Sequence, residues 1–144
     1  MVDLSGIRAA IATKVGAVSG IALSTSSNFG GVVDVPAYLV NTVKAIDTVD
    51  HEALSQEFRE LEIDCDLLLA KTGDINDAVT NADALVESIY TASYSGITLG
   101  FPTVVYDSWI DKTERGALTY AGQEWEGATQ RWKVRLRETI DRSA

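Results

Sequence analysis

The sequence has very little of two residue types on which many functional sites depend: one cysteine, Cys65, and one histidine, His51. A lone cysteine excludes an intramolecular disulfide, so we expect a reducing compartment. A lone histidine excludes metal sites built on two histidines, and any Ser-His-Asp or Cys-His arrangement would depend on His51 alone. We expect His51, in its charged surroundings, to be a solvated surface residue, and Cys65 to be a core thiol.

Long apolar runs and positive charge are also scarce. No stretch approaches about 18 apolar residues, and no basic segment followed by an apolar run opens the chain, so we expect neither a membrane partner nor an export signal. Twelve Lys and Arg residues stand against 21 Asp and Glu residues, for a formal net charge of −9. This charge opposes a general affinity for nucleic acid or anionic lipid. The glycine-containing stretches match no P-loop or dinucleotide fingerprint, so no cofactor is predicted.

The composition that remains is typical of a globular protein. Apolar residues make up 46% of the chain and charged residues 23%. A chain of 144 residues is long enough to fold as one domain, residues 1–144, around a single core that no disulfide or metal has to support.

Two stretches have the apolar spacing of amphipathic helices. Residues 3–18 form the first, with Asp3 or Ser5 available as the N-cap, and residues 75–94 form the second, with Asp74 as its cap. The apolar positions that carry these predictions are Ile7, Ile11, Val15 and Val18 in the first stretch, and Ile75, Ala78, Val79, Ala82, Leu85, Val86 and Ile89 in the second.

Strands are expected between these helices. In the predicted strand 58–70, the odd-numbered positions from Leu61 to Leu69, including Cys65, are apolar, and the even-numbered positions between them, including Leu68, would face outward. Residues 37–49 are ambiguous between a strand and a short helix, and we favour a strand. The segment 19–31, rich in Ser and Gly, predicts a loop.

The C-terminal part of the chain predicts three further strands and a closing β-hairpin. The strands would cover residues 97–110, 117–126 and 129–140, separated by a polar turn at 111–116 and a turn centred on Gly127. The resulting order α-β-β-α-β-β-β implies an α+β fold. An antiparallel or mixed sheet would carry two helices on one face.

Residues with chemical potential are few. Four carboxylates stand two residues apart on the 58–70 strand: Glu60, Glu62, Asp64 and Asp66. They could hold a hard cation, but the D-x-D-x-D-G calcium loop is missing, so we favour a solvated or subunit-facing acidic strip. We expect no catalytic, metal-binding or cofactor-binding residue. Trp132 is expected in the core, whereas Trp109 or Trp125 could anchor an interface.

Positive charge gathers at the end of the chain. Five of the twelve basic residues follow position 130: Arg131, Lys133, Arg135, Arg137 and Arg142. The first four would form an outward row on the last strand. Glu124 and Glu126 are expected on its partner strand, where each cross-strand pair contributes ~0.2–1 kcal/mol. The row suits contact between unlike surfaces of two subunits, and equally an ordinary salt-bridged hairpin.

The order of these elements resembles that of the tail terminator proteins of long-tailed bacteriophages. The likeness covers most of the chain and rests on the first helix, the loop that ends near Pro36, the alternating acidic strand, the second helix and a closing motif. The second helix has the spacing A-x-x-L-x-x-x-I from Ala82 to Ile89. The closing motif reads Y-x-G-x-E-W-x-G-A…W-x-V-x-L from Tyr120 to Leu136.

The resemblance implies a structural protein of the virion tail and neck, assembled in the host cytoplasm and without enzymatic activity. It implies a homo-oligomer, a hexameric ring, whose partners are the tail tube protein and the head-completion or stopper protein. Genomic DNA would only pass through the channel of the ring. An acidic lining would keep the DNA from binding to the channel wall. The segments 19–31 and 95–117 are expected to make contacts that order on assembly.

From the charges we predict a set of subunit contacts: Glu62, Asp64, Asp66, Glu124, Glu126, Arg131, Lys133, Arg135 and Arg137. Two alternatives stay open. Another neck or tail-tube subunit would show much of the same pattern. A small ligand-binding or enzymatic α+β domain would instead use Trp109, Trp125 and the acidic strand to line a pocket.

Overall fold

The computed structural model describes residues 3–27, 34–52, 56–73 and 80–139. One mixed sheet has the strand order β1-β2-β3-β5-β4, in which β1 and β2 are parallel and all other neighbours antiparallel. The α+β fold with a C-terminal β-hairpin is therefore confirmed. The elements are α1 (Leu4–Gly16), β1 (Leu23–Thr25), β2 (Ala37–Glu52), β3 (Gln56–Lys71), α3 (Ala82–Ser93), β4 (Val105–Tyr120) and β5 (Gln123–Thr139).

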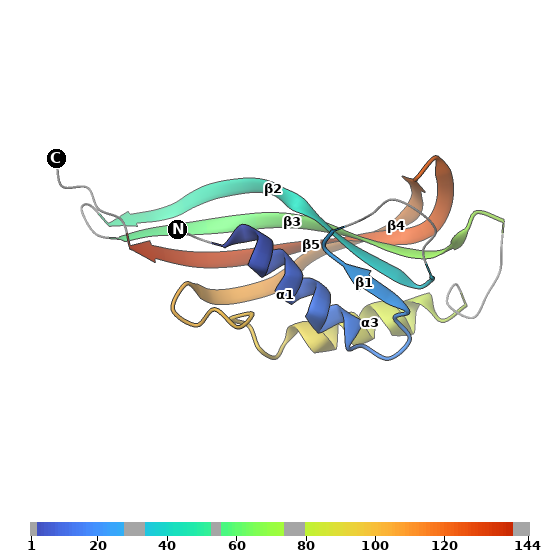
Figure 1. Ribbon diagram of the computed structural model, residues 1–144, viewed down its shortest axis with the longest axis horizontal. Helices are drawn as coiled ribbons and strands as arrows, with labels where there is room; N and C mark the ends of the chain where they lie inside the picture. Colours follow the sequence, from blue (N-terminus) through green and yellow to red (C-terminus); the bar gives the residue numbers. More distant parts are fainter. Residues whose placement is uncertain (1–2, 28–33, 53–55, 74–79, 140–144) are drawn as a thin grey trace.

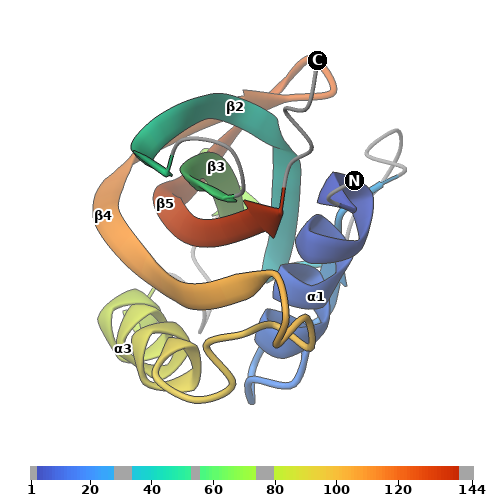
Figure 2. The same cartoon turned by 90° about the vertical axis from the view of Figure 1, so that its left-hand side faces the viewer.

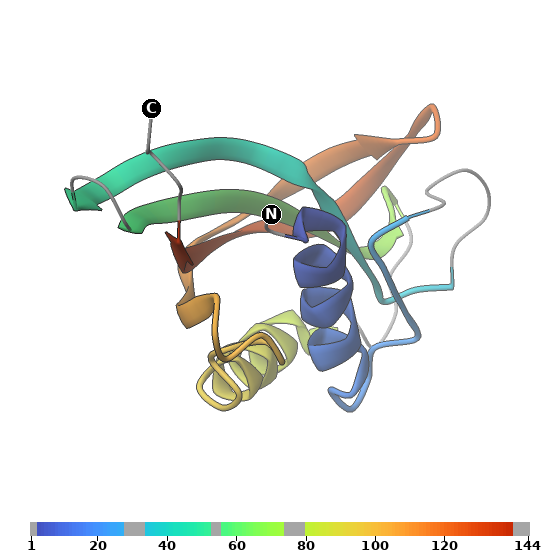
Figure 3. The same cartoon turned by 60° about the vertical axis from the view of Figure 1, so that its left-hand side comes forward.

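Both helices pack on one face of the sheet, as predicted (Figures 1 and 3). Figure 2 looks along the strands and shows β3 and β5 between the outer strands β2 and β4. We call the face under the helices, which contains Ile63, Cys65 and Trp132, the helix-covered face. The opposite face, which contains Glu62 and Lys133, is the helix-free face. Within the described residues, no helix is long and apolar enough to cross a membrane.

The main core lies between the helices and the helix-covered face. Ile7, Ile11 and Val15 of α1 are buried there together with Leu85 and Ile89 of α3. Their spacing of three or four residues places them on one side of each helix, which is why the sequence predicts the buried faces correctly. Trp132 and the Cys65 thiol are also completely buried in this core, as expected.

The two helices differ in how closely the structure follows their predicted bounds. In α1, Oδ1 of Asp3 accepts a hydrogen bond of 2.8 Å from the Gly6 amide, so Asp3 is the predicted N-cap. In α3, Asn81 occupies the N-cap position without a side-chain capping bond. The predicted cap Asp74 and the predicted start of the helix, Ile75 to Val79, lie outside the described residues.

The strand predictions near the middle of the chain are confirmed, with one error in β3. Leu68 is buried and does not face solvent. It belongs to a second, smaller core on the helix-free face, with Ala37, Leu39 and Trp125. An alternating pattern cannot show this, because a strand buried on both faces has no polar side. The predicted loop at 19–31 also contains β1, whose three residues are too few to show a strand period.

The C-terminal hairpin differs most from the prediction. The strand β4 runs without interruption through the expected turn at 111–116, and Gly127 lies within β5, so two strands replace the three predicted ones. The predicted strand 97–110 is wrong over residues 97–104, which form turns before β4 begins at Val105. The true turn is at Ala121 and Gly122, which both have positive φ, 53° and 73°. A two-residue turn with positive φ at both positions matches the twist of the flanking strands.

The predicted turn at Gly127 is wrong because this glycine allows the backbones of β3 and β5 to pack closely. An ideal Cβ at Gly127 would lie 2.1 Å from the carbonyl oxygen of Leu67. Only glycine lets the two neighbouring backbones approach this closely, and glycine within a strand often marks such an approach. Composition alone cannot distinguish this use of glycine from its use in a turn.

Candidate functional site

The most organised polar feature is a ladder of charges on the helix-free face. The register of β3 and β5 sets Glu60 opposite Arg135, Glu62 opposite Lys133, and Asp64 opposite Arg131. Because residues two apart in a strand share a face, all six side chains lie on the same surface. We call these three acidic and three basic residues the charge ladder: Glu60, Glu62, Asp64, Arg131, Lys133 and Arg135.

Each cation of the charge ladder is within ion-pair distance of a carboxylate. Nζ of Lys133 lies 3.2 Å from both Glu60 Oε2 and Glu62 Oε1, so it bridges two successive acidic residues. The Nε of Arg135 lies 3.1 Å from Glu60 Oε1. The Nε of Arg131 lies 3.2 Å from an oxygen of Asp64. The ladder therefore neutralises itself within one chain.

The neighbouring strands extend the charge ladder. Nζ of Lys44, on β2, lies 3.4 Å from Asp64 Oδ2. Asp66 has no cation opposite it, and its two oxygens accept hydrogen bonds from Asn41 Nδ2 at 3.2 Å and Thr129 Oγ1 at 3.1 Å. Lys44 is not part of the predicted set, because the ambiguous period of residues 37–49 did not show which face its side chain occupies.

The contacts within the ladder shift the pKa values of Glu60 and Lys133. Partial burial alone would raise the pKa of Glu60, but hydrogen bonds from Arg135 and Lys133 outweigh it and lower the pKa below its ordinary value. Partial burial would likewise lower the pKa of Lys133, and hydrogen bonds to Glu62 and Glu60 outweigh it and raise the pKa. Both shifts favour the charged forms, so Glu60 and Lys133 stay ionised near neutral pH.

Aromatic side chains flank one end of the ladder. The guanidinium carbon of Arg135 lies 5.7 Å from the centre of the Trp109 ring, a cation–π contact. Phe58 and Tyr106 meet edge to face, with 5.9 Å between ring centres. Trp109 on β4 pairs with Lys133 on β5, and Trp125 lies on β5 eight residues before Lys133. That separation is about 26 Å along the strand, so Trp109 and Trp125 do not line one pocket.

Glu124 and Glu126 do not lie where the prediction placed them. Both are on β5, the same strand as the basic row, and not on its partner strand. The prediction failed because it cut β5 in two at Gly127. Both side chains are exposed near the hairpin turn. Oε1 of Glu124 accepts a hydrogen bond of 3.2 Å from Thr72 Oγ1.

Of the nine predicted subunit-contact residues, five belong to the charge ladder and Asp66 lies beside it. The other three lie apart from the ladder: Glu124, Glu126 and Arg137. Arg137 is exposed at the far end of β5. The strand therefore presents negative charge near its beginning and positive charge near its end. The role of all nine residues in subunit contacts remains a prediction.

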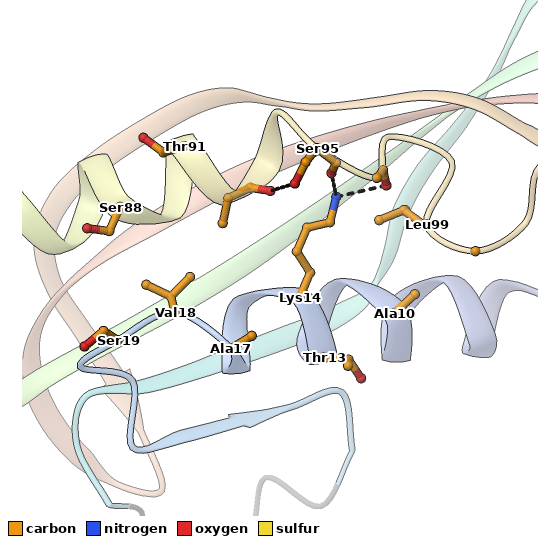
Figure 4. A pocket seen from close by; sticks show the side chains of 13 residues that line it. Ala10, Thr13, Lys14, Ala17, Val18, Ser19, Ser88, Thr91, Ser95 and Leu99 are labelled. Carbon is orange, nitrogen blue, oxygen red and sulfur yellow. Dashed lines mark hydrogen bonds between the residues drawn. The ribbon is translucent and has the colours of Figure 1, made fainter.

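A groove of about 840 Å³ separates α1 from α3 (Figure 4). Three hydroxyls on its walls, of Thr13, Ser88 and Thr91, each donate to the backbone carbonyl four residues earlier in their own helix. Lys14 reaches across the groove, and its Nζ donates to the carbonyl oxygens of Ser95 and Gly96. These donors are thus used within the protein.

Cys65 and His51 are the two residues that the sequence offered for nucleophilic or acid–base chemistry. Burial raises the pKa of the Cys65 thiol, which favours the unreactive protonated form. His51 lies in β2, and its side chain is not among those described. Among the residues that the structure describes, no three His, Cys, Asp or Glu side chains are grouped to hold a metal ion.

The fold can be compared with known proteins. No family model matches the sequence, and no curated protein sequence matches it. A chain of a solved structure described as the virion of a native gene transfer agent particle has a similar fold, with a TM-score of 0.56 and 12% identity. The match covers 96% of this chain and 100% of that chain. At this identity the likeness establishes a shared fold, and function has to be argued from the surfaces.

Proposed function

We propose that the protein is a structural component of a virion, which acts through assembly and not through catalysis. The observation that carries this proposal is the match to a chain of the gene transfer agent virion, because it spans 96% of this protein and the whole of that chain. A match that is nearly complete in both directions means that the two domains share one architecture from end to end.

Within that class we propose a tail terminator, a hexameric ring that caps the tail tube and meets the head-completion protein. The resemblance of the closing motif, Tyr120 to Leu136, supports this role. Rings are built from contacts between unlike surfaces of identical copies. The separation of exposed charge along β5, with Glu126 near one end and Arg137 near the other, supplies unlike surfaces.

Electrostatics also favours this role. The formal net charge of −9 repels the phosphate backbone of DNA. The basic residues Arg131, Lys133 and Arg135, which would otherwise attract phosphates, are neutralised by the carboxylates of β3. A channel built from such a protein would let DNA pass without holding it.

An enzymatic or ligand-binding role is the other class that the sequence left open. Its two aromatic candidates, Trp109 and Trp125, lie far apart, and the donors named in the α1–α3 groove are occupied within the chain. A binding pocket usually has a few convergent polar groups that are free to meet a ligand. We therefore prefer assembly.

Light scattering after size-exclusion chromatography tests the proposal. The purified protein would be measured over a range of concentrations and salt, alone and with purified tail tubes. We expect a hexamer, or a monomer that forms rings on tubes. A monomer that is indifferent to concentration, salt and tubes would contradict the proposal.

A further inference from the structure

The sheet has two long edges that no strand of the described residues covers. One is the outer side of β4, which is 16 residues long and pairs only with β5. The other belongs to β2, because β1 pairs only with Ala37 to Leu39 and β2 continues to Glu52. Unpaired backbone groups on a sheet edge are a template for another strand.

Arg8 closes a short part of the β2 edge just beyond β1. Its Nε donates to the carbonyl oxygen of Asn41 at 2.7 Å, and its Nη2 donates to those of Val40 at 3.1 Å and Ser26 at 2.6 Å. A helix side chain thus occupies edge carbonyls that another strand would otherwise use. The open edge of β2 therefore starts after Asn41.

The directions of the strands make the two open edges compatible with each other. The four long strands β2, β3, β5 and β4 alternate in direction across the sheet. The number of long strands is even, so β2 and β4 run in opposite directions. If copies are related by rotation about an axis along the strands, β4 of one copy meets β2 of the next as an antiparallel neighbour.

Both edges carry exposed charges of both signs. Asp111 and Lys112 are exposed on β4, and Lys44 and Asp47 are exposed on β2, so opposite charges can face each other across the contact. No proline interrupts the regular part of β4 from Lys112 to Tyr120. Proline within an edge strand is one of the devices that prevent edge pairing.

We infer that copies of this chain join by strand addition between the β4 edge of one copy and the β2 edge of the next, and that Arg8 sets the limit of the pairing. The contact is heterologous, so it continues around a ring until the ring closes. This inference rests on the proposed function, since it describes how the ring would be held together. It moves the main contact from the charge ladder to the sheet edges.

Paired cysteines test the contact directly, because Cys65 is completely buried and will not interfere. Each variant would carry Asp47→Cys on β2 and one cysteine on β4, placed in turn at exposed positions. For the pair that is in register, oxidation of the assembled protein should give a series of covalent oligomers. The number of chains in the largest oligomer would equal the number of copies in the ring. The β4 positions are Tyr106, Asp111, Lys112, Glu114 and Ala117.

The single-cysteine variants are the matched controls. In a head-to-tail contact the cysteine on β2 of one copy does not meet the same cysteine of the next copy. These single-cysteine variants should therefore stay monomeric on denaturing gels. Covalent dimers from the single β4 cysteines would show a two-fold β4 contact and would overturn the inference. Rings that assemble normally, with no pair cross-linking, would also overturn it while leaving the proposed function intact. Failure to assemble at all would instead count against the function.

Arg8 provides a second, independent readout. In Arg8→Ala the carbonyls of Val40 and Asn41 are free, so we expect the register to slip, with loss of the strongest cross-link and gain at neighbouring β4 positions. Arg8→Lys keeps the charge and one donor and should retain more of the original register. Circular dichroism would show that both variants are folded. An unchanged cross-linking pattern in folded Arg8→Ala would remove Arg8 from the contact.

Discussion

Oε1 of Gln130 accepts a hydrogen bond of 2.6 Å from the hydroxyl of Tyr38, and both side chains are completely buried. The Tyr38 hydroxyl itself accepts a hydrogen bond of 2.9 Å from Nε1 of Trp132. Nε2 of Gln130 continues the chain to Thr113 at 3.3 Å, and Thr113 meets the hydroxyl of Tyr90 on α3 at 2.8 Å. Polar groups buried in an apolar core need such partners, because unmade hydrogen bonds are costly there.

Tyr38→Phe should therefore destabilise the protein by ~1–3 kcal/mol, since it leaves buried groups of Gln130 and Trp132 without their partner. Urea unfolding followed by circular dichroism measures this loss. Tyr120→Phe is the matched control: the Tyr120 hydroxyl is buried and finds no hydrogen-bond partner among the described residues. We expect that control to be neutral or slightly stabilising. Equal effects of the two substitutions would show that the hydrogen-bond chain contributes nothing.

Gly127 and its cross-strand neighbour Gly116 offer a second matched pair. Gly127→Ala would set a methyl group against the Leu67 carbonyl and should cost ~1–3 kcal/mol, the usual range for overpacking. Gly116→Ala meets nothing within 4 Å and should be neutral or stabilise by up to ~1 kcal/mol. Thermal unfolding of both variants checks the difference. A harmless Gly127→Ala would mean that β3 and β5 can separate at this point without loss.

The pKa shift of Glu60 predicts how stability depends on pH. Its pKa is lower in the folded protein than the ordinary value of 4.5, because hydrogen bonds from Arg135 and Lys133 outweigh partial burial. The stabilisation is therefore fully present above the ordinary value and is lost as pH falls through the folded value. Unfolding free energies measured from neutral to acid pH should fall less steeply in Glu60→Gln than in the unchanged protein. Identical slopes would contradict this account.

Substitutions of Arg137 and Arg135 distinguish an effect on ring assembly from an effect on the stability of the fold. Arg137→Glu changes an exposed residue outside the charge ladder, so it should leave the unfolding free energy within about 0.5 kcal/mol of its original value. If Arg137 belongs to a subunit contact, the same change should weaken ring formation in light scattering. Arg135→Glu should lower stability as well, because it sets a negative charge against Glu60. Normal assembly of Arg137→Glu would remove Arg137 from the predicted contacts.

Local patterns determined most of the fold of this protein. The spacing of Ile7, Ile11 and Val15 establishes which side of α1 is buried, because helix geometry repeats every 3.6 residues whatever the helix packs against. The alternation around Cys65 establishes the buried face of β3 in the same way. These properties depend on neighbouring residues alone, so they can be read before any long-range contact is known.

Only the tertiary structure decided which strands lie side by side. The pairing of β3 with β5 turns Glu62 and Lys133, distant in sequence, into a salt bridge within one chain. The same pairing explains Gly127, whose role depends on the backbone at Leu67. The partner, register and open edges of a strand are set by contacts remote in sequence. Alternation therefore predicts the face on which a charge lies, and only the folded sheet shows what that charge meets.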